Sequence, residues 1–176
     1  MKAITRQFNL FLVLTALAML CGCQTAKDKP SKEVSALRVH IEVNPDNTGT
    51  SQTVTVVHDD PMPFTIANEP ILSEANIIAA KVIEARGGFA VEIQFDEINT
   101  LVLEQYSAAN PGKHFVIFGQ WGEKLAAGRW LAAPFITHRI VGGRLSFTPD
   151  MTREEADRLV LGLNNVAKKT IKGQLK

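Results

Sequence analysis

Apolar residues in this chain recur at two different spacings, and the switch between them constrains the fold more than any other feature. From Leu37 to Val43 and from Phe89 to Phe95, apolar and polar residues alternate, as they do in half-buried strands. From Ala156 to Ala167 the apolar residues instead follow a helical spacing. The combination predicts an α+β domain in which two amphipathic helices pack on one face of an antiparallel sheet.

Both expected helices have recognisable starts. Asp96 stands at an N-cap position, and Asn110-Pro111-Gly112 stops the helix that follows it. The apolar stripe expected on this helix is Ile98, Leu101, Val102 and Ala109. The segment Thr152-Arg153-Glu154-Glu155 is a capping box that opens the last helix.

The segment Ile77–Ala85 is ambiguous, because its alanines suit a helix. Gly87-Gly88 follows it, and two glycines form a favoured two-residue hairpin turn because both tolerate positive φ. We therefore predict a hairpin, with Phe89–Phe95 as its second strand. Further strands are expected at Gln52–Val57, Phe64–Ile66, His114–Phe118 and Arg144–Thr148, with a turn-rich segment from Gly119 to Gly128.

The N-terminus has the features of an export signal. Lys2 and Arg6 precede an apolar run, Phe8–Leu20, that is short for a hydrocarbon core about 30 Å thick. The run ends in Leu20-Cys21-Gly22-Cys23, which is similar to a bacterial lipobox. We expect Cys23 to be the lipidated first residue of the mature chain, since Gly22 is small and the bulky Leu20 disfavours Cys21. The alternatives are an ordinary cleaved signal peptide, or an uncleaved anchor with a disulfide between the two cysteines.

This reading divides the chain into four parts. Residues 1–22 are the signal peptide, 23–36 a polar flexible tether, 37–70 N-terminal strands and 71–170 the main α+β domain. The acyl anchor, a diacylglycerol with palmitate as a typical chain, makes the lipid bilayer a partner. Gln24 replaces the aspartate that usually signals inner-membrane retention, so a periplasm-facing site on the outer membrane is favoured if the host has two membranes.

Composition excludes several classes of function. A formal net charge of +1 over 176 residues argues against a nucleic-acid partner, which calls for a basic surface. No cysteine follows Cys23, so the exported domain has neither a disulfide nor a thiolate nucleophile.

The remaining titratable residues do not form a catalytic or metal-binding pattern. None of His40, His58, His114 and His138 belongs to a helical metal motif. A site from His58, Asp59 and Asp60 is disfavoured, because adjacent strand residues point to opposite faces. The acidic pairs Asp96-Glu97 and Glu154-Glu155 fall at helix starts, where the helix dipole explains them. We expect no enzyme activity, no cofactor and no metal.

A cluster of aromatic and basic residues is the candidate binding site. Its members are Trp121, Arg129, Trp130, Phe135 and Arg139, types that are enriched at binding hot spots. We expect them to line an exposed apolar groove with cationic rims. The alternative is that both tryptophans only cover one end of the sheet.

Seven short motifs between residues 71 and 166 together carry a family resemblance. In chain order they are Leu72–Ile77, Ala80-Lys81-Val82, Gly88–Phe95, Pro111–Ile117, Ala133-Pro134-Phe135-Ile136, Gly142-Gly143-Arg144 and Thr152–Leu159. Their order resembles the head subdomain of the first periplasmic region of SecD, part of the SecDF export motor. The resemblance implies an α+β module without known catalytic residues that engages an emerging polypeptide outside the inner membrane.

Two departures limit what the resemblance implies. SecD couples proton flow to movement of its head through transmembrane helices, and we expect none after the signal. The family's Asp-Gly turn is replaced by Gly119-Gln120-Trp121-Gly122. The leading hypothesis is therefore a non-enzymatic envelope lipoprotein that binds protein or peptide. The alternatives are an assembly subunit whose sheet edge docks one partner by strand addition, and a small-ligand or hydrolytic protein with an unrecognised site.

Overall fold

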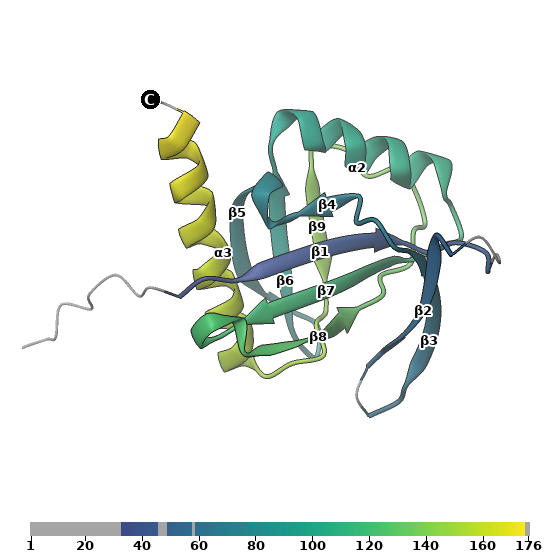
Figure 1. The fold of residues 1–176 in the computed structure, drawn as a ribbon, viewed down its shortest axis with the longest axis horizontal. Helices are drawn as coiled ribbons and strands as arrows, with labels where there is room; N and C mark the ends of the chain where they lie inside the picture. The colour runs from purple at the N-terminus through teal and green to yellow at the C-terminus, as the bar shows by residue number, and fades with distance from the viewer. Residues whose placement is uncertain (1–32, 46–48, 58, 175–176) are drawn as a thin grey trace, which may run out of the picture. The chain divides into compact units, whose positions relative to one another are not determined.

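The computed structural model describes residues 33–45, 49–57 and 59–174, and these residues belong to one compact unit. Within them the chain forms nine β-strands, two α-helices and two short 3₁₀ turns (Figure 1). The predicted α+β class is thus confirmed. The expected signal peptide, Cys23 and nearly all of the expected tether lie outside the described residues.

The elements follow one another in an order that alternates hairpins with helices. They are β1 (Ala36–Ile41), β2 (Ser51–Val56), β3 (Met62–Ala67), β4 (Leu72–Ser73), η1 (Glu74–Asn76), β5 (Ile77–Ala85), β6 (Gly88–Phe95), α2 (Glu97–Ala109), β7 (Phe115–Trp121), η2 (Glu123–Leu125), β8 (Ala127–Ala132), β9 (Arg144–Phe147) and α3 (Arg153–Gln174).

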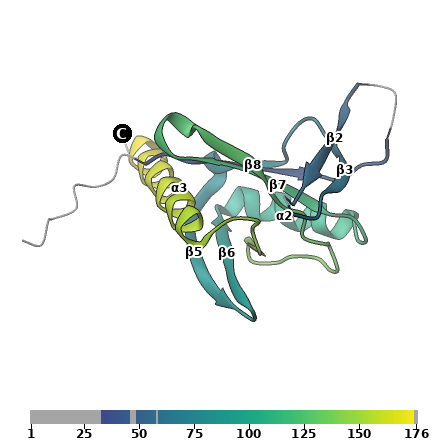
Figure 2. The ribbon, with the colours of Figure 1, turned by 90° about the horizontal axis from the view of Figure 1, so that it is seen from below.

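The strands of the described part divide among three antiparallel sheets, where the sequence predicts one. The largest has the order β4-β1-β7-β8, the second is the β2–β3 hairpin, and the third has the order β5-β6-β9. Figure 2 shows the β2–β3 hairpin on one side of the four-stranded sheet, with α2, α3 and the β5–β6 strands on the other. The four-stranded sheet therefore has both faces covered over part of its area.

Strand β1 lies in the middle of the four-stranded sheet, between β4 and β7. Leu37, Val39 and Ile41 alternate along it and enter the main core, as the pattern predicts. The opposite face was expected to be polar and exposed, but His40 on that face is buried. The burial of His40 follows from the β2–β3 hairpin, whose docking on this face the alternation cannot reveal.

Helix α3 covers the main core and begins as predicted. The backbone N–H of Thr152 donates to Glu155 Oε2 over 2.9 Å, and the N–H of Glu155 donates to Thr152 Oγ1 over 3.2 Å, which confirms the capping box. Leu159 and Leu163 are fully buried on its inner face. Asn164 joins the helix to β5, since its side chain bonds both the N–H and the carbonyl of Ala80 at 2.9 and 2.8 Å.

Helix α2 also starts as predicted, because Asp96 Oδ1 accepts from the backbone N–H of Asn99 at 2.8 Å. Its expected apolar stripe is wrong at three of its four positions, because Ala109 is exposed as well as Ile98 and Leu101. Ile98 and Leu101 are 75% and 66% exposed, whereas Leu103 and Ser107 are buried. The helix carries two overlapping apolar stripes, and periodicity alone does not say which one meets the core.

The hairpin predicted for residues 77–95 forms, and the helical alternative for Ile77–Ala85 is wrong. Its turn differs by one residue from the expected Gly-Gly pair. Ala85 pairs with Gly88, so the two-residue loop is Arg86-Gly87, with Gly87 at φ +84°. Only one of the two glycines therefore meets the positive φ that the turn requires.

The segment from Gly119 to Gly128, expected to be rich in turns, contains the end of β7 and the start of β8. Its strand glycines are sites of close packing. A Cβ on Gly119 would lie 2.5 Å from Leu131 Cδ1, and one on Gly128 would lie 2.8 Å from Gln120 Cγ. Glycine inside a strand often marks a close approach of neighbouring atoms. Because glycine is also common in turns, the sequence predicts turns here where the structure has strands.

The first described residues are fastened to α3. Glu33 Oε1 accepts hydrogen bonds from the N–H of Gly122 at 2.9 Å and from Arg158 Nη2 at 3.1 Å, and its carbonyl accepts from Asn165 Nδ2 at 2.9 Å. Ser35 then packs so closely that a Cβ on Gly162 would lie 2.1 Å from its Oγ. The start of β1 is therefore held at several points.

Candidate functional site

A thin apolar layer joins the β2–β3 hairpin to the four-stranded sheet. Its buried members are Val56, Phe64, Ile66 and Val116, with Val54, Val57, Trp130 and Ala133 packed around them. We call this set the hairpin layer. Val116 lies between Phe115 and Ile117 on β7, which face the main core, so alternation along one strand supplies both layers.

His40 fixes the base of the hairpin. Its Nδ1 lies 2.8 Å from the carbonyl oxygen of Ala67, and its ring meets Trp130 edge-on at 5.4 Å between centroids. Burial lowers the pKa of His40 below its ordinary value of 6.5; the hydrogen bond to Ala67 opposes this shift, and the positive charge of Arg38 adds to it. The neutral imidazole is therefore the form that suits the docked hairpin.

A second histidine sits where β1, β3 and the segment after β8 meet. His114 Nδ1 and its backbone N–H both contact Glu42 Oε2, at 2.7 and 2.9 Å. Its ring lies between Phe64 and Phe135, at 4.9 and 5.1 Å from their centroids. This contact set gives His114 a structural role.

Of the five predicted binding residues, Trp121 and Arg129 form an internal support. Trp121 is only 1% exposed, so its predicted place on an open groove is wrong. The guanidinium carbon of Arg129 lies 5.2 Å from the Trp121 ring, its Nη2 lies 3.0 Å from Glu155 Oε2, and its Nε donates to the Asp150 carbonyl over 2.9 Å. The arginine thus links β8 to the start of α3.

Of the other three predicted residues, Trp130 lines a second hollow together with Arg129, whereas Phe135 and Arg139 are not part of that hollow's lining. Trp130 is half-buried in the hairpin layer and lies 5.1 Å from Phe118 between ring centroids. Phe135 is 55% exposed beside His114. Arg139 pairs with Glu104 on α2. The five side chains therefore do not line one groove, and the sheet-covering alternative describes Trp121.

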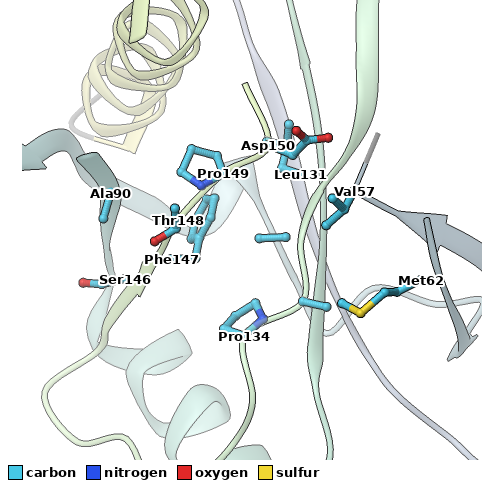
Figure 3. Close-up of a pocket in the computed structure, with 12 residues that line it drawn as sticks. Val57, Met62, Ala90, Leu131, Pro134, Ser146, Phe147, Thr148, Pro149 and Asp150 are labelled. Carbon is cyan, nitrogen blue, oxygen red and sulfur yellow. The ribbon is translucent and has the colours of Figure 1, made fainter. Parts of the chain in front are cut away.

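The structure instead contains a cleft beside β8, with a volume of about 700 Å³. We call it the inter-sheet cleft. Its lining comes from the hairpin, β6, β8, β9 and the loop before α3: Val57, Met62, Ala90, Leu131, Ala132, Ala133, Pro134, Ser146, Phe147, Thr148, Pro149 and Asp150. Figure 3 shows Leu131 and Pro134 on one side, Ser146 and Phe147 on the other, and Met62 at the hairpin side.

The lining of this cleft is mostly aliphatic, aromatic and proline carbon, with one carboxylate at one end. Beside that end, a shallower hollow brings together Asp59, Asp150, Glu155 and Arg129, which gives more acidic than basic groups. Burial alone would raise the pKa of Glu155, but hydrogen bonds from the Thr152 backbone and from Arg129 outweigh it and lower that pKa. Glu155 is therefore ionised at neutral pH, where it pairs with Arg129.

The tip of the hairpin carries an unusual backbone conformation. Val57 has φ +71° and lines the cleft. A β-branched residue rarely adopts positive φ, because its side chain crowds the backbone. Such conformations gather at ligand-binding and switch regions, which agrees with a functional tip.

Sequence reasoning missed the residues that form the cleft. Met62 is 45% exposed and lies between Pro61 and Pro63, outside the strands expected at Gln52–Val57 and Phe64–Ile66. The exposed methionine between strand-breaking residues is a weak signal for a surface that contacts a partner. Pro134 belongs to one of the family motifs, and its role as a cleft wall follows only from the fold.

The paired acids are placed as predicted, at the starts of α2 and α3. His58, from the disfavoured metal site, lies outside the described residues. Over the part of the chain that the structure describes, no three histidine, cysteine, aspartate or glutamate side chains gather in a metal-binding arrangement. In the same residues, no helix has the length and apolar character needed to cross a membrane.

The family model described as the SecDF P1 head subdomain matches residues 50–167. The match covers more than half of the chain, so this protein belongs to the SecDF P1 head family, and the resemblance carried by the motifs is confirmed. The matched segment begins after β1, although β1 occupies the middle of the largest sheet. No curated protein sequence matches the chain.

The chain shares its fold with solved structures of SecDF. One is the crystal structure of SecDF in its super-membrane-facing form, with 19% identity and a TM-score of 0.51 over 74% of this chain and 18% of that chain. The other is the structure of a membrane component SecDF that enhances protein export, with 19% identity and a TM-score of 0.51 over 75% of this chain and 63% of that chain. This chain covers less than two thirds of either.

Proposed function

We propose that this protein is a non-enzymatic lipoprotein of the cell envelope whose P1 head domain binds polypeptide segments in the inter-sheet cleft. The first component of the proposal is its location. The P1 head of SecDF is periplasmic, and the lipobox-like segment ending at Cys23 supports a periplasm-facing domain on an acyl anchor.

The observation that carries the binding role is the cleft itself. Its walls offer apolar side chains and the backbone of two sheet edges, at Leu131–Pro134 and at Ser146–Asp150. Apolar contact area with backbone hydrogen-bonding groups suits a polypeptide of varied sequence better than it suits one small polar molecule. A SecDF structure is described as that of a component that enhances protein export, and handling of exported chains is the role we propose here.

A photocrosslinking experiment tests this role in cells. A photoreactive residue replaces Met62 in the full-length protein at its native level, and Leu161 on α3 is the matched control, since the two are 45% and 43% exposed. We expect a ladder of adducts with many exported proteins from position 62 and none from position 161. Equal adducts from both positions, or none from position 62, would contradict binding in the cleft.

Palmitate labelling of the same cells tests the proposed acyl anchor at Cys23. Labelled palmitate should enter the wild-type protein and should be absent from the Cys23→Ser variant, because only the thiol forms the thioether. Label in both proteins would contradict Cys23 as the acylated residue.

One observation favours a second function, that of a subunit docked to a fixed partner. Ile98 and Leu101 lie three residues apart on the exposed face of α2, and Val141 is also 65% exposed. A single discrete adduct from a crosslinker at Leu101, with none from position 62, would support this assembly role over the binding of many clients.

A further inference from the structure

Two sheet edges face each other across the inter-sheet cleft. Within the described part of the chain, β8 has β7 as its one neighbour and β9 has β6 as its one neighbour. An edge strand has backbone donors and acceptors on its free side, which normally need a cover. Residues from both edges line the cleft, so the two free sides lie along it (Figure 3).

Hydrogen bonds show which backbone groups of the β8 side point into the cleft. The N–H of Asp150 donates to the carbonyl of Leu131 at 2.7 Å, so the peptide groups of Leu131 point away from β7. The carbonyl of Pro134 accepts from Phe115 at 3.1 Å and so points toward β7. Because backbone groups of an edge strand alternate between its two sides, Ala133 also presents its N–H and carbonyl to the cleft.

The same reasoning applies to β9. The N–H of Phe95 donates to the carbonyl of Gly143 at 2.9 Å, which makes these two residues a bonded pair between β6 and β9. Alternation then turns Leu145 and Phe147 toward β6 and leaves Ser146 and Thr148 facing the cleft. The cleft therefore has outward-facing backbone groups on both walls.

The two edges touch at one end only. Among the described residues, the bond from Asp150 to Leu131 is the one backbone hydrogen bond that joins the segment 144–150 to the segment 127–134. Beyond it the strands separate around the cleft, as the positions of Pro134 and Ser146 show (Figure 3). The gap is lined by backbone on both sides and closed at the Asp150 end.

We propose that an extended segment of the bound polypeptide enters this gap as an additional strand. It bonds Ala133 on one side and Ser146 and Thr148 on the other, beyond the bond between Asp150 and Leu131, and so joins the four-stranded and three-stranded sheets into one. This inference rests on the proposed function and specifies its binding mode. Main-chain pairing accepts many sequences, which suits a protein that handles varied clients.

The surroundings select the side chains of the inserted strand. Val57 and Met62 from the hairpin are part of the lining, so the segment favours uncharged apolar residues along the gap. The preferred occupant is therefore an extended apolar segment.

A peptide that lacks every second backbone N–H donor tests this binding mode. The probe is a twelve-residue peptide of alternating valine and threonine with a terminal lysine. The comparison peptide has the same sequence but is N-methylated at alternate positions. Binding is measured by calorimetry to the full-length protein in detergent micelles. We expect the methylated peptide to bind at least about tenfold more weakly, because methylation removes N–H donors and keeps the side chains.

Amide exchange and one pair of variants supply independent readings. Binding of the unmethylated peptide should slow exchange at Ala133, Ser146 and Thr148 and leave the Arg86-Gly87 turn unchanged. Ser146→Pro removes one donor on the cleft side without breaking the β6 ladder, so it should weaken binding about tenfold, whereas Ser146→Ala should bind as the wild type does.

The outcomes separate the two proposals. If both peptides bind equally well and the cleft amides exchange at unchanged rates, strand insertion is wrong while polypeptide binding stands. If neither peptide binds and a crosslinker at position 62 captures no client, the proposed function fails and the binding mode fails with it.

Discussion

The two faces of the four-stranded sheet support apolar layers of very different size. The main core draws buried residues from β1, β4, β5, β6, β7, β8, β9, α2 and α3. The hairpin layer has four buried members, three of which belong to the hairpin or its ends. An element that packs against many others in one cluster is harder to displace than one held by a small layer. We therefore expect the main core to unfold only with the whole domain and the hairpin to detach locally.

This difference indicates that the β2–β3 hairpin is the part of the domain that moves at the smallest cost in free energy. The β2–β3 hairpin contributes Val57 and Met62 to the inter-sheet cleft, and its docking depends on the thin layer, on the His40 contact and on the backbone hydrogen bond from Val43 to Thr65. A binding site whose cover is held weakly can open to admit a chain while the rest of the domain stays folded. Three predictions test this contrast, from the largest expected effect to the smallest.

The largest effect is expected in the main core. Leu159→Ala empties a fully buried site under α3 and should lower the free energy of unfolding by about 3 kcal/mol. Leu161→Ala on the same helix is the control, because Leu161 is 43% exposed and its loss should change stability by less than about 0.5 kcal/mol. Urea unfolding followed by far-UV circular dichroism measures both, and similar losses in the two variants would contradict the assigned core.

An intermediate effect is expected in the hairpin layer. Ile66→Ala removes a fully buried side chain and should weaken hairpin docking by about 2 kcal/mol. Hydrogen exchange should therefore accelerate in β2 and β3 while the amides of β5 and α3 keep their protection. Acceleration of equal size in all four elements would mean that the hairpin and the main core unfold as one unit.

The smallest effect is the pH dependence of hairpin docking. Burial lowers the pKa of His40 below 6.5, so the unfolded or undocked state binds a proton more readily. Docking is therefore most stable above pH 6.5 and weakens as the pH falls from 6.5 through the lower pKa of the docked state. The exchange rates of β2 and β3 amides between about pH 7.5 and about pH 5, corrected for intrinsic exchange, measure it.

A matched pair of variants isolates the contribution of His40. His40→Gln should remove this part of the pH dependence, whereas His138→Gln, at an exposed loop position, should keep it. An unchanged slope in the His40 variant would assign the effect to another group.

Much of the fold could be predicted from the sequence because local rules and tertiary contacts agree there. Alternation identified β1 and β6, and the caps at Asp96 and Thr152 located both helices. The errors arise where a tertiary contact decides between equal local patterns. On α2, the apolar residues of the exposed face, Ile98 and Leu101, follow the same helical spacing as those of the buried face. Only the contact with the core determines which face is buried.

The candidate site was predictable to a much smaller degree. Trp121 and Arg129 are residue types that are common at binding surfaces, but Arg129 lies over the Trp121 ring and pairs with Glu155, so both support the start of α3. The inter-sheet cleft depends on which strands end as sheet edges, and strand order does not follow from the periodicity of one sequence. The family motifs predicted the domain and not the location of its cleft.

The fastening of Glu33 also determines how the domain carries mechanical load. A pull on the chain ahead of Glu33 meets the contacts with Gly122, Arg158 and Asn165 and then runs along β1. Hydrogen bonds between antiparallel strands lie perpendicular to the strands, so the six pairs between β1 and β7 are loaded in shear and resist together. Strand β7 passes the load to β8, the wall of the cleft. The wall of the cleft is thus connected to Glu33 by a stiff path two strand spacings wide.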